Sequence, residues 1–412
     1  MIMIPPRSGG RRREMRIADV RCCPVQAPGR TLVVILVETD AGLVGVGEAG
    51  LQRRWQAVAG AVEHLKPRLI GQDPMRSEHL WQHLFRGGFY PADRVIGSTI
   101  AGIDIALWDL KGQALGVPVY QLLGGRCRDY VEVFTNPRYL GGGGDGVDAA
   151  LLDRALALGE SQATAELARQ WVALGHRYFR LGFAECRDGD RFEPREGLRT
   201  LVAQLEAVRT AVGAQLELMV DLHARLTPAD AIWFCRAVEP FGMFLVEDPI
   251  RSEHPLTYRT IRQHVNVPLA AGEQWSSKWE FAPVIEEELI DFARVDVCIA
   301  GGLTEARKIA AMAEAHYIQI LPHNPLGPVC TAASLHLDLA TPNAGPQEVI
   351  FHPNRMLPEV FECAFEHVGS RLTVPDASGI GVRFNEQAAR AYPAEMTEPP
   401  HLQREDGSYV NA

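Results

Sequence analysis

Eight short apolar segments recur between about residues 130 and 350, and amphipathic helical stretches separate them. Each segment is rich in residues that favour strands, and each interval is long enough for a crossover helix. Eight such units predict an α/β fold in which parallel strands close into a (β/α)8-type (modified TIM) barrel. The segments are 131–135, 177–182, 216–221, 243–248, 267–273, 291–296, 317–323 and 347–350.

The chain before the barrel has a different pattern. TLVVILVETD, residues 31–40, is rich in β-branched residues, a DAG turn follows, and LVGVGE resumes the strand, which predicts a hairpin. Helical stripes follow in 55–65 and from about 98 to 116. We therefore expect a disordered extension over 1–14, an N-terminal α+β capping domain over 15–129, the barrel over 130–370, and a C-terminal segment, 371–412, packing on the cap.

Composition narrows the possible partners. A net charge of −10 and a pI near 5.8 disfavour nucleic acid and anionic membranes, so a small molecule is the expected partner. No run approaches the ~20 apolar residues of a membrane helix, and the basic N-terminus lacks the apolar core of a secretion signal. The eight cysteines have no CxxC spacing, which favours a reducing, cytoplasmic location.

Acidic residues and a histidine fall at or near the ends of successive predicted strands, at intervals of 26, 26, 23, 27 and 25 residues. Each interval is one βα unit, and the carboxyl ends of barrel strands surround a common mouth where active sites lie. A single carboxylate at a strand end is more often a helix cap or a loop residue. Six groups in phase predict a site; they are Asp221, Glu247, Glu273, Asp296, His323 and Glu348.

The first three carboxylates are candidate metal ligands. Like charges that converge in a concave site raise one another's pKa, and a divalent cation removes this conflict. Ligation by the oxygens of Asp221, Glu247 and Glu273 alone favours Mg²⁺ over Zn²⁺, which prefers His or Cys. Bound Mg²⁺ can hold a substrate carboxylate and stabilise the enediolate left when the α-proton is removed.

His223 follows Asp221 by two positions. Alternation along a strand directs both side chains to one side if the extended conformation continues past the strand end. We interpret His223 as part of the site, and a solvated loop histidine remains the alternative.

The second histidine, His323, has a candidate orienting partner on a neighbouring strand. Asp296 can bind its imidazole, fix the tautomer and raise the basicity, although a buried structural pair would leave the same pattern. Glu348, on the next strand, is interpreted either as a protonated donor to a substrate carboxylate or as a salt-bridge partner at the rim.

Two glycine-rich stretches imitate nucleotide-binding motifs. GVGEAG, residues 45–50, matches GxGxxG but lies in a hairpin, and no acidic residue follows about 20 positions later. GGGG, residues 141–144, lacks the Gly-Lys-Ser/Thr continuation of a phosphate loop. We interpret the first as turn chemistry and the second as a mobile loop.

The chain resembles the mandelate racemase subgroup of the enolase superfamily, and within it the galactonate dehydratase-like acid-sugar dehydratases. The resemblance extends from about Met15 to Arg383 and rests on several long motifs. These are ETDAGLVGVGEA, LIGQDP, FRGGFY and AGIDIALWDLKGQALGVPVYQLLGG in the predicted cap, and VDLH, VEDP, AGEQ, ARVDVCIAGGLTEARKIA and PHNPLGPVCTAASLHLD in the barrel.

The resemblance implies roles for the same residues. Asp221, Glu247 and Glu273 match the metal ligands, His323 with Asp296 matches the base dyad, His223 matches the acid, and Glu348 matches a carboxylate that binds substrate. The implied reaction removes the α-proton of an aldonate and expels the β-hydroxyl, giving a 2-keto-3-deoxy acid. It also suggests a homo-oligomer.

Arg180 departs from the family pattern, because a lysine is usual at this place. Arginine keeps its proton and is no base, but it can pair with an anionic substrate; a structural salt bridge is the alternative.

Two rival functions remain open, an epimerase that moves a proton between the two histidines and a catalytically idle metabolite-binding relative. We expect the cap stretches LQRRWQ and FRGGFYPADR to set substrate specificity.

Overall fold

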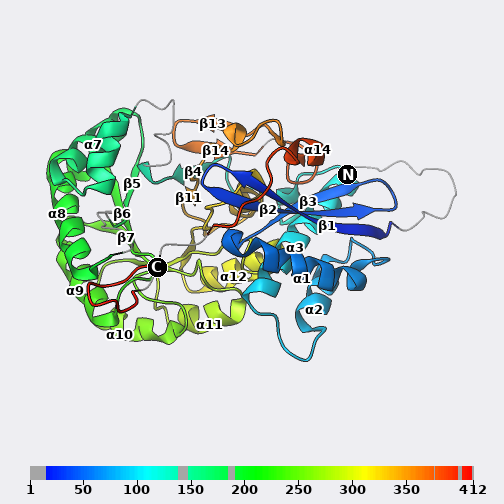
Figure 1. Cartoon of the computed structure of the whole chain (residues 1–412), viewed down its shortest axis with the longest axis horizontal. Coiled ribbons are helices and arrows are strands. Elements are labelled where there is room, and N and C mark those ends of the chain that lie inside the picture. Colours follow the sequence, from blue (N-terminus) through cyan, green and yellow to red (C-terminus); the bar gives the residue numbers. More distant parts are fainter. Residues whose placement is uncertain (1–14, 138–146, 184–190, 375, 398–400, 411–412) are drawn as a thin grey trace.

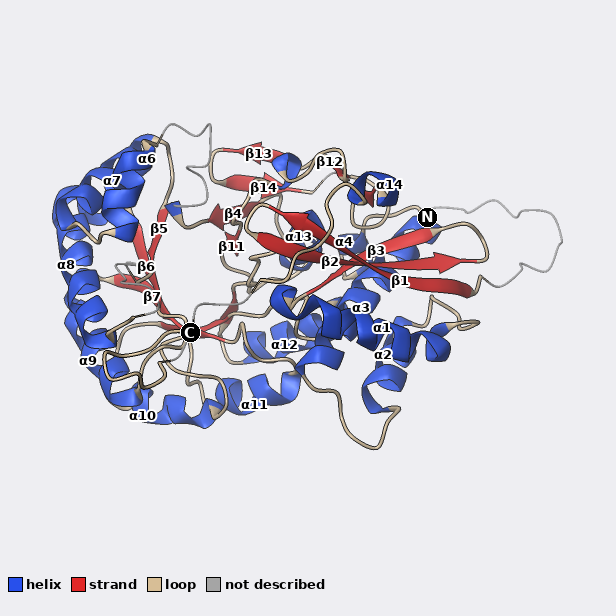
Figure 2. Ribbon diagram, viewed as in Figure 1, coloured by secondary structure: helices blue, strands red, loops and turns tan. Residues whose placement is uncertain are grey.

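The computed structural model describes residues 15–137, 147–183, 191–374, 376–397 and 401–410. A strand forms in each of the eight predicted segments, and Figures 1 and 2 show these strands as a ring with helices around the outside. The predicted barrel is confirmed. Its strands are β4 (Val131–Phe134), β5 (Tyr178–Leu181), β6 (Glu217–Asp221), β7 (Met243–Glu247), β8 (Leu269–Ala271), β9 (Phe292–Ala293), β10 (Gln319–Ile320) and β11 (Gln347–Glu348).

The ring is held by two sets of parallel ladders. Strands β5 to β10 pair in chain order in one sheet, and β11 pairs with β4. Between the two sets, an isolated parallel bridge joins Ile320 to Ala344, just before β11. This order puts the carboxyl ends of all eight strands at one mouth.

A helix follows each of the first seven barrel strands. Their inner faces are apolar; in α8, for example, Leu198, Leu201, Leu205, Val208 and Val212 are buried at helical spacing. Burying each such side chain contributes roughly 1.5–3 kcal/mol to folding. The helices are α7 (Ser161–Ala173), α8 (Pro194–Val212), α9 (Pro228–Val238), α10 (Tyr258–Arg262), α11 (Lys278–Glu286), α12 (Leu303–Ala315) and α13 (Pro328–Leu339), and α6 (Ala149–Leu152) with a π-helical turn (Asp153–Ala157) precedes α7.

The N-terminal cap is an antiparallel sheet with helices packed against it, as predicted. The sheet order is β1 (Ile17–Ala27), β2 (Arg30–Thr39) and β3 (Val44–Ala49). GVGEAG overlaps β3 and is not a turn: a Cβ at Gly47 would lie 1.8 Å from the Gly102 carbonyl oxygen of α3, so glycine permits the close approach of strand and helix. The helices are α1 (Trp55–Leu69), α2 (Ser77–Arg86), α3 (Arg94–Leu115) and α4 (Val119–Leu122).

The C-terminal segment touches both parts of the molecule. Strand β14 pairs with β4 of the barrel, the Gln26 amide donates to the Tyr392 carbonyl, and the Phe192 amide donates to the Gln403 carbonyl. The late elements are β12 (Phe361–Cys363), β13 (Glu366–Val368), β14 (Arg371–Thr373), β15 (Val382–Phe384) and α14 (Glu386–Ala389). Short 3-10 turns occupy Gln52–Arg54, Gly213–Gln215, Glu239–Phe241, Pro255–Thr257 and Pro353–Arg355.

The described residues also bear on the predictions about membrane helices and cysteines. No helix in the described ranges is long and apolar enough to cross a bilayer. The seven described cysteines are free thiols. The expected extension 1–14 and the GGGG stretch lie outside the described residues.

Candidate active site

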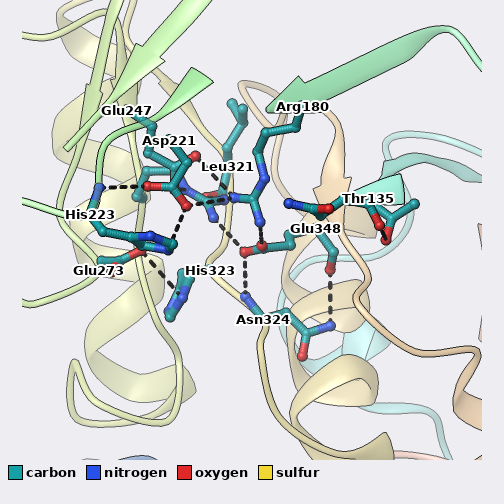
Figure 3. Close-up of polar contacts among 12 residues, drawn as sticks. Thr135, Arg180, Asp221, His223, Glu247, Glu273, Leu321, His323, Asn324 and Glu348 are labelled. Atoms are coloured by element: carbon teal, nitrogen blue, oxygen red, sulfur yellow. Dashed lines mark hydrogen bonds and ion pairs between the residues drawn. The ribbon is translucent and has the colours of Figure 1, made fainter. Parts of the chain in front are cut away.

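The predicted carboxylates meet at the mouth of the barrel. Asp221 and Glu247 are register partners at the ends of β6 and β7, and Glu273 follows β8. Oxygen atoms of Glu247, Asp248 and Glu273 lie within 4.8 Å of one another. Figure 3 shows Asp221, Glu247 and Glu273 grouped with His223 and His323.

His223 turns back onto Asp221. Its Nε2 lies 2.9 Å from Asp221 Oδ2, and its amide donates to Oδ1 over 3.0 Å. The extended conformation does not continue past β6, because His223 and Ala224 have φ angles of 46° and 56°. The imidazole is half exposed, and the pKa of His223 is raised, first by the charge of Asp221 and against the effect of burial.

His323 lies between two carboxylates. Its Nδ1 is 2.8 Å from Asp296 Oδ2, and its Nε2 is 3.3 Å from Glu273 Oε2. Burial disfavours the charged ring, but Glu273 and the hydrogen bond to Asp296 outweigh it and raise the pKa of His323 to about 10. The predicted pair of His323 and Asp296 is therefore present, and the other ring nitrogen, Nε2, faces Glu273 of the acidic cluster.

Two buried arginines neutralise the centre of the site. Arg180 Nη1 lies 3.1 Å from Glu247 Oε2 and 3.5 Å from Asp221 Oδ2. Arg294 donates through Nε to Glu247 Oε1 over 2.6 Å, and through Nη1 to the Leu321 carbonyl over 2.9 Å. Both guanidinium groups also pair with Glu348. A cation placed at the neighbouring carboxylates would therefore share Glu247 with both arginines.

Glu348 is buried inside the barrel and does not lie at its rim. Burial alone would raise the pKa of Glu348, but Arg180 and Arg294 lower it well below its ordinary value. The Asn324 amide also donates to Glu348, over 3.1 Å. Glu348 is therefore a charged acceptor here and not the protonated donor considered from the sequence.

Sequence reasoning missed three buried polar residues of the site, Asp248, Arg294 and Asn324. Arg294 precedes Asp296 by two positions, so strand alternation alone would have directed it to the same side as Asp296. Asp248 follows Glu247 directly and would be expected on the opposite side. A φ of 38° at Asp248 changes that direction, and the sequence carries no signal for it.

A cavity of about 610 Å³ lies between this cluster and the cap. It is lined by Glu273, Asp296 and His323 from the barrel, and by residues 51–54 and Arg94 from the cap. The wall of this cavity thus includes parts of both stretches expected to set specificity, LQRRWQ and the end of FRGGFYPADR. A slightly larger cavity of about 650 Å³ lies between the cap and the C-terminal segment, away from these carboxylates.

A capped parallel barrel with acidic strand ends and a histidine–aspartate dyad is the architecture of enolase-like enzymes. Two family models match this chain, the mandelate racemase / muconate lactonizing enzyme N-terminal domain over residues 15–124 and the enolase C-terminal domain-like model over residues 163–388. The chain belongs to the mandelate racemase / muconate lactonizing enzyme family of the enolase superfamily.

Curated relatives match over nearly their whole length. A "D-galactonate dehydratase family member" of Streptomyces bingchenggensis is 39% identical over 94% of this chain and 96% of its own. A D-mannonate dehydratase of Caulobacter sp. is 35% identical over 96% and 100%. An enolase from Pantoea ananatis, solved with bound D-gluconate and Mg, superposes with a TM-score of 0.86 at 30% identity over 97% of this chain and 100% of that one.

Proposed function

We propose that this protein is a Mg²⁺-dependent acid-sugar dehydratase that converts an aldonate to a 2-keto-3-deoxy acid. The observation that carries the proposal is the position of His323, held by Asp296 with its Nε2 3.3 Å from Glu273 in the acidic cluster. The names of the relatives support the reaction class, and the neighbour with bound gluconate and Mg supports the ligand classes. A cytoplasmic homo-oligomer remains our expectation.

The proposed metal ligands are Asp221, Glu247 and Glu273, and their chemistry suits Mg²⁺. All the proposed donors are carboxylate oxygens. Those of Glu247 and Glu273 lie within 4.8 Å of one another and of Asp248, whose buried Oδ2 has no hydrogen-bond partner among the described residues. When bound, Mg²⁺ supplies positive charge for the substrate carboxylate and for the charge that develops after deprotonation.

The two histidines take the proton-transfer roles. His323 accepts the α-proton at Nε2, because Nδ1 is engaged by Asp296. Glu273 contributes to the raised pKa of His323, and this contribution would be smaller if Glu273 held a cation. His223, kept protonated beside Asp221, donates a proton to the departing β-hydroxyl, which is otherwise a poor leaving group.

The contacts of Arg180 favour an ion pair within the barrel over direct binding of substrate. Asp221, Glu247 and Glu348 surround its guanidinium, and the side chain is only 5% exposed. We assign it the role of fixing the charged residues in place. Glu348, which binds both arginines, is assigned the same role, with Asn324 as its neighbour.

The test is turnover of four- to six-carbon aldonates and aldarates with Mg²⁺ in D₂O, followed by keto-acid formation and by deuterium incorporation. Keto-acid from one stereochemical series, lost in His323→Asn or with EDTA, is the expected result. Deuterium incorporation into unconsumed or epimerised substrate without keto-acid would indicate an epimerase. Saturable binding with neither signal would indicate an idle relative and contradict the proposal.

A further inference from the structure

We propose that Glu48 of the cap is a positioning residue for the dyad of His323 and Asp296. The inference rests on the proposed function, in which this dyad removes the α-proton. Glu48 lies in β3 with its side chain wholly buried. Its Oε1 accepts from the Gly327 amide and its Oε2 from the Cys330 amide, each over 2.9 Å, at the start of barrel helix α13.

Helix α13 cannot cap its own N-terminus. Its N-cap residue, Gly327, has no side chain, and its first helical residue, Pro328, has no amide proton. Glu48 accepts from two of the remaining free amides at this end of the helix. Because Gly327 follows His323 by four positions, the capped end holds the loop that carries His323.

The fit between Glu48 and Gly327 is close. A Cβ at Gly327 would lie 2.9 Å from Glu48 Oε1 and 3.0 Å from Oε2. The φ of Gly327 is −95°, so its backbone is open to other residues and the neighbouring atoms restrict the position. Leu32 Cδ1 of the cap would also lie 2.9 Å from that Cβ, so two cap side chains, Glu48 and Leu32, require the glycine.

The chain just after β3 also holds the loop of Asp296. The Gly50 amide donates to the Cys298 carbonyl over 2.8 Å, and the Cys298 amide donates to Asp296 Oδ1 over 2.7 Å. Ser98 of the cap donates to the same carbonyl over 3.0 Å. Residues 48–50 thus contact both barrel loops that carry the dyad.

The partners of Glu48 lie on one side of the mouth. Loss of Glu48 should therefore impair the dyad and leave the binding of Mg²⁺ nearly unchanged. Gly327 and Cys330 follow β10, whereas the proposed metal ligands lie at the ends of β6 and β7 and just after β8. Glu48→Gln keeps the volume but turns an N–H group toward one of the two amides. We expect kcat and α-proton exchange to fall about 10²-fold through misplacement of His323, with the Kd for Mg²⁺ within twofold of wild type.

Asp109→Asn is the matched control. Asp109 is also a buried carboxylate of the cap that accepts from two backbone amides, Val46 and Ile380, each over 2.9 Å. Neither amide belongs to a loop with a proposed catalytic residue. We expect this variant to lower the melting temperature and to leave kcat within about threefold of wild type.

Gly327→Ala provides a second measurement if Glu48→Gln folds poorly. The added Cβ displaces Glu48, so the variant should show the same fall in kcat with unchanged Mg²⁺ affinity. In Glu48→Ala the carboxylate is gone and only Leu32 Cδ1, 2.9 Å from the added Cβ, still has to move. Adding Gly327→Ala should therefore cost less than it does in the wild type.

The outcomes distinguish failure of the role proposed for Glu48 from failure of the proposed dehydratase function. Equal kcat losses in Glu48→Gln and Asp109→Asn, or parallel losses of kcat and Mg²⁺ affinity, would overturn the role of Glu48 and leave the proposed function intact. A wild-type protein with neither deuterium exchange nor keto-acid formation on the whole panel would overturn both.

Discussion

Arg180 Nη1 lies 3.1 Å from Glu247 Oε2, and the two side chains are 5% and 0% exposed. The guanidinium therefore neutralises the same carboxylate that we propose as a magnesium ligand. Removing one member of a buried ion pair leaves an uncompensated charge in a poorly solvated place. The stability of the protein should then depend on whether the Arg180 guanidinium or a bound Mg²⁺ neutralises Glu247.

Arg180→Met should lower the free energy of unfolding by about 3–5 kcal/mol in EDTA, because Asp221, Glu247 and Glu348 lose a counter-charge. Saturating Mg²⁺ should recover more stability in the variant than in wild type. Urea denaturation with and without Mg²⁺ measures both effects. Arg259→Met, which breaks an exposed pair with Glu287, is the control and should leave stability nearly unchanged in both conditions. Equal stabilisation of Arg180→Met and wild type by Mg²⁺ would contradict competition for the same carboxylates.

His223→Asn should separate proton abstraction from elimination. His223 pairs with Asp221, whereas His323 pairs with Asp296 and Glu273, so His323 can still exchange the α-proton in this variant. We expect keto-acid formation to fall about 10²- to 10⁴-fold while deuterium continues to enter the substrate. Loss of both signals to the same extent would show that His223 is not confined to the elimination step.

Asp296→Asn should reverse the tautomer of His323. In the neutral ring, an aspartate that accepts from Nδ1 leaves Nε2 without a proton, whereas an asparagine amide can donate to Nδ1 and place the proton on Nε2. We expect kcat to fall about 10²- to 10⁴-fold with little change in Mg²⁺ affinity. Steady-state kinetics and calorimetric titration with Mg²⁺ test this. Retention of a tenth or more of the activity would contradict an orienting role.

His336 should make the protein less stable in acid. Its buried Nδ1 accepts from the Tyr120 amide, and burial lowers the pKa of His336 to about 4 from an ordinary 6.5. Its neutral ring thus stabilises the fold above pH 6.5, and this contribution, roughly 3 kcal/mol, is lost as the pH falls toward 4.

His336→Asn keeps an acceptor and removes the titration. Its free energy of unfolding should depend less steeply on pH between 6.5 and 4 than that of wild type, as urea denaturation across this range would show. Identical slopes for wild type and His336→Asn would exclude His336 as the cause.

Much of the fold was predictable because the barrel repeats one simple pattern. Each predicted strand is present, although β9 and β10 are only two residues long, since ladder hydrogen bonds extend over a shorter range than the apolar pattern. The dyad of His323 and Asp296 followed from strand-end spacing alone. Periodicity places residues on a face of a strand, and the fold then brings these faces together.

Side chains beyond the strand ends were less predictable. His223 reaches Asp221 through a left-handed turn and not through continued alternation, and a positive φ also redirects Asp248. Glu348 could not be assigned from the sequence, since its charge depends on Arg180 and Arg294, which approach from other strands. Contacts of this kind depend on three-dimensional packing that no local pattern encodes.

The contact between Glu48 and Gly327 also bears on how the chain folds. It joins positions 279 residues apart, so almost the whole barrel must be synthesised before the cap can close it. Loop closure over such a distance is slow, and the stabilising contacts form only after the loop has closed. During synthesis the cap emerges first, and Glu48 lacks its two amide partners until α13 has been made. We therefore expect docking of the cap to be a late step in folding, and the proton-abstracting dyad to become competent only then.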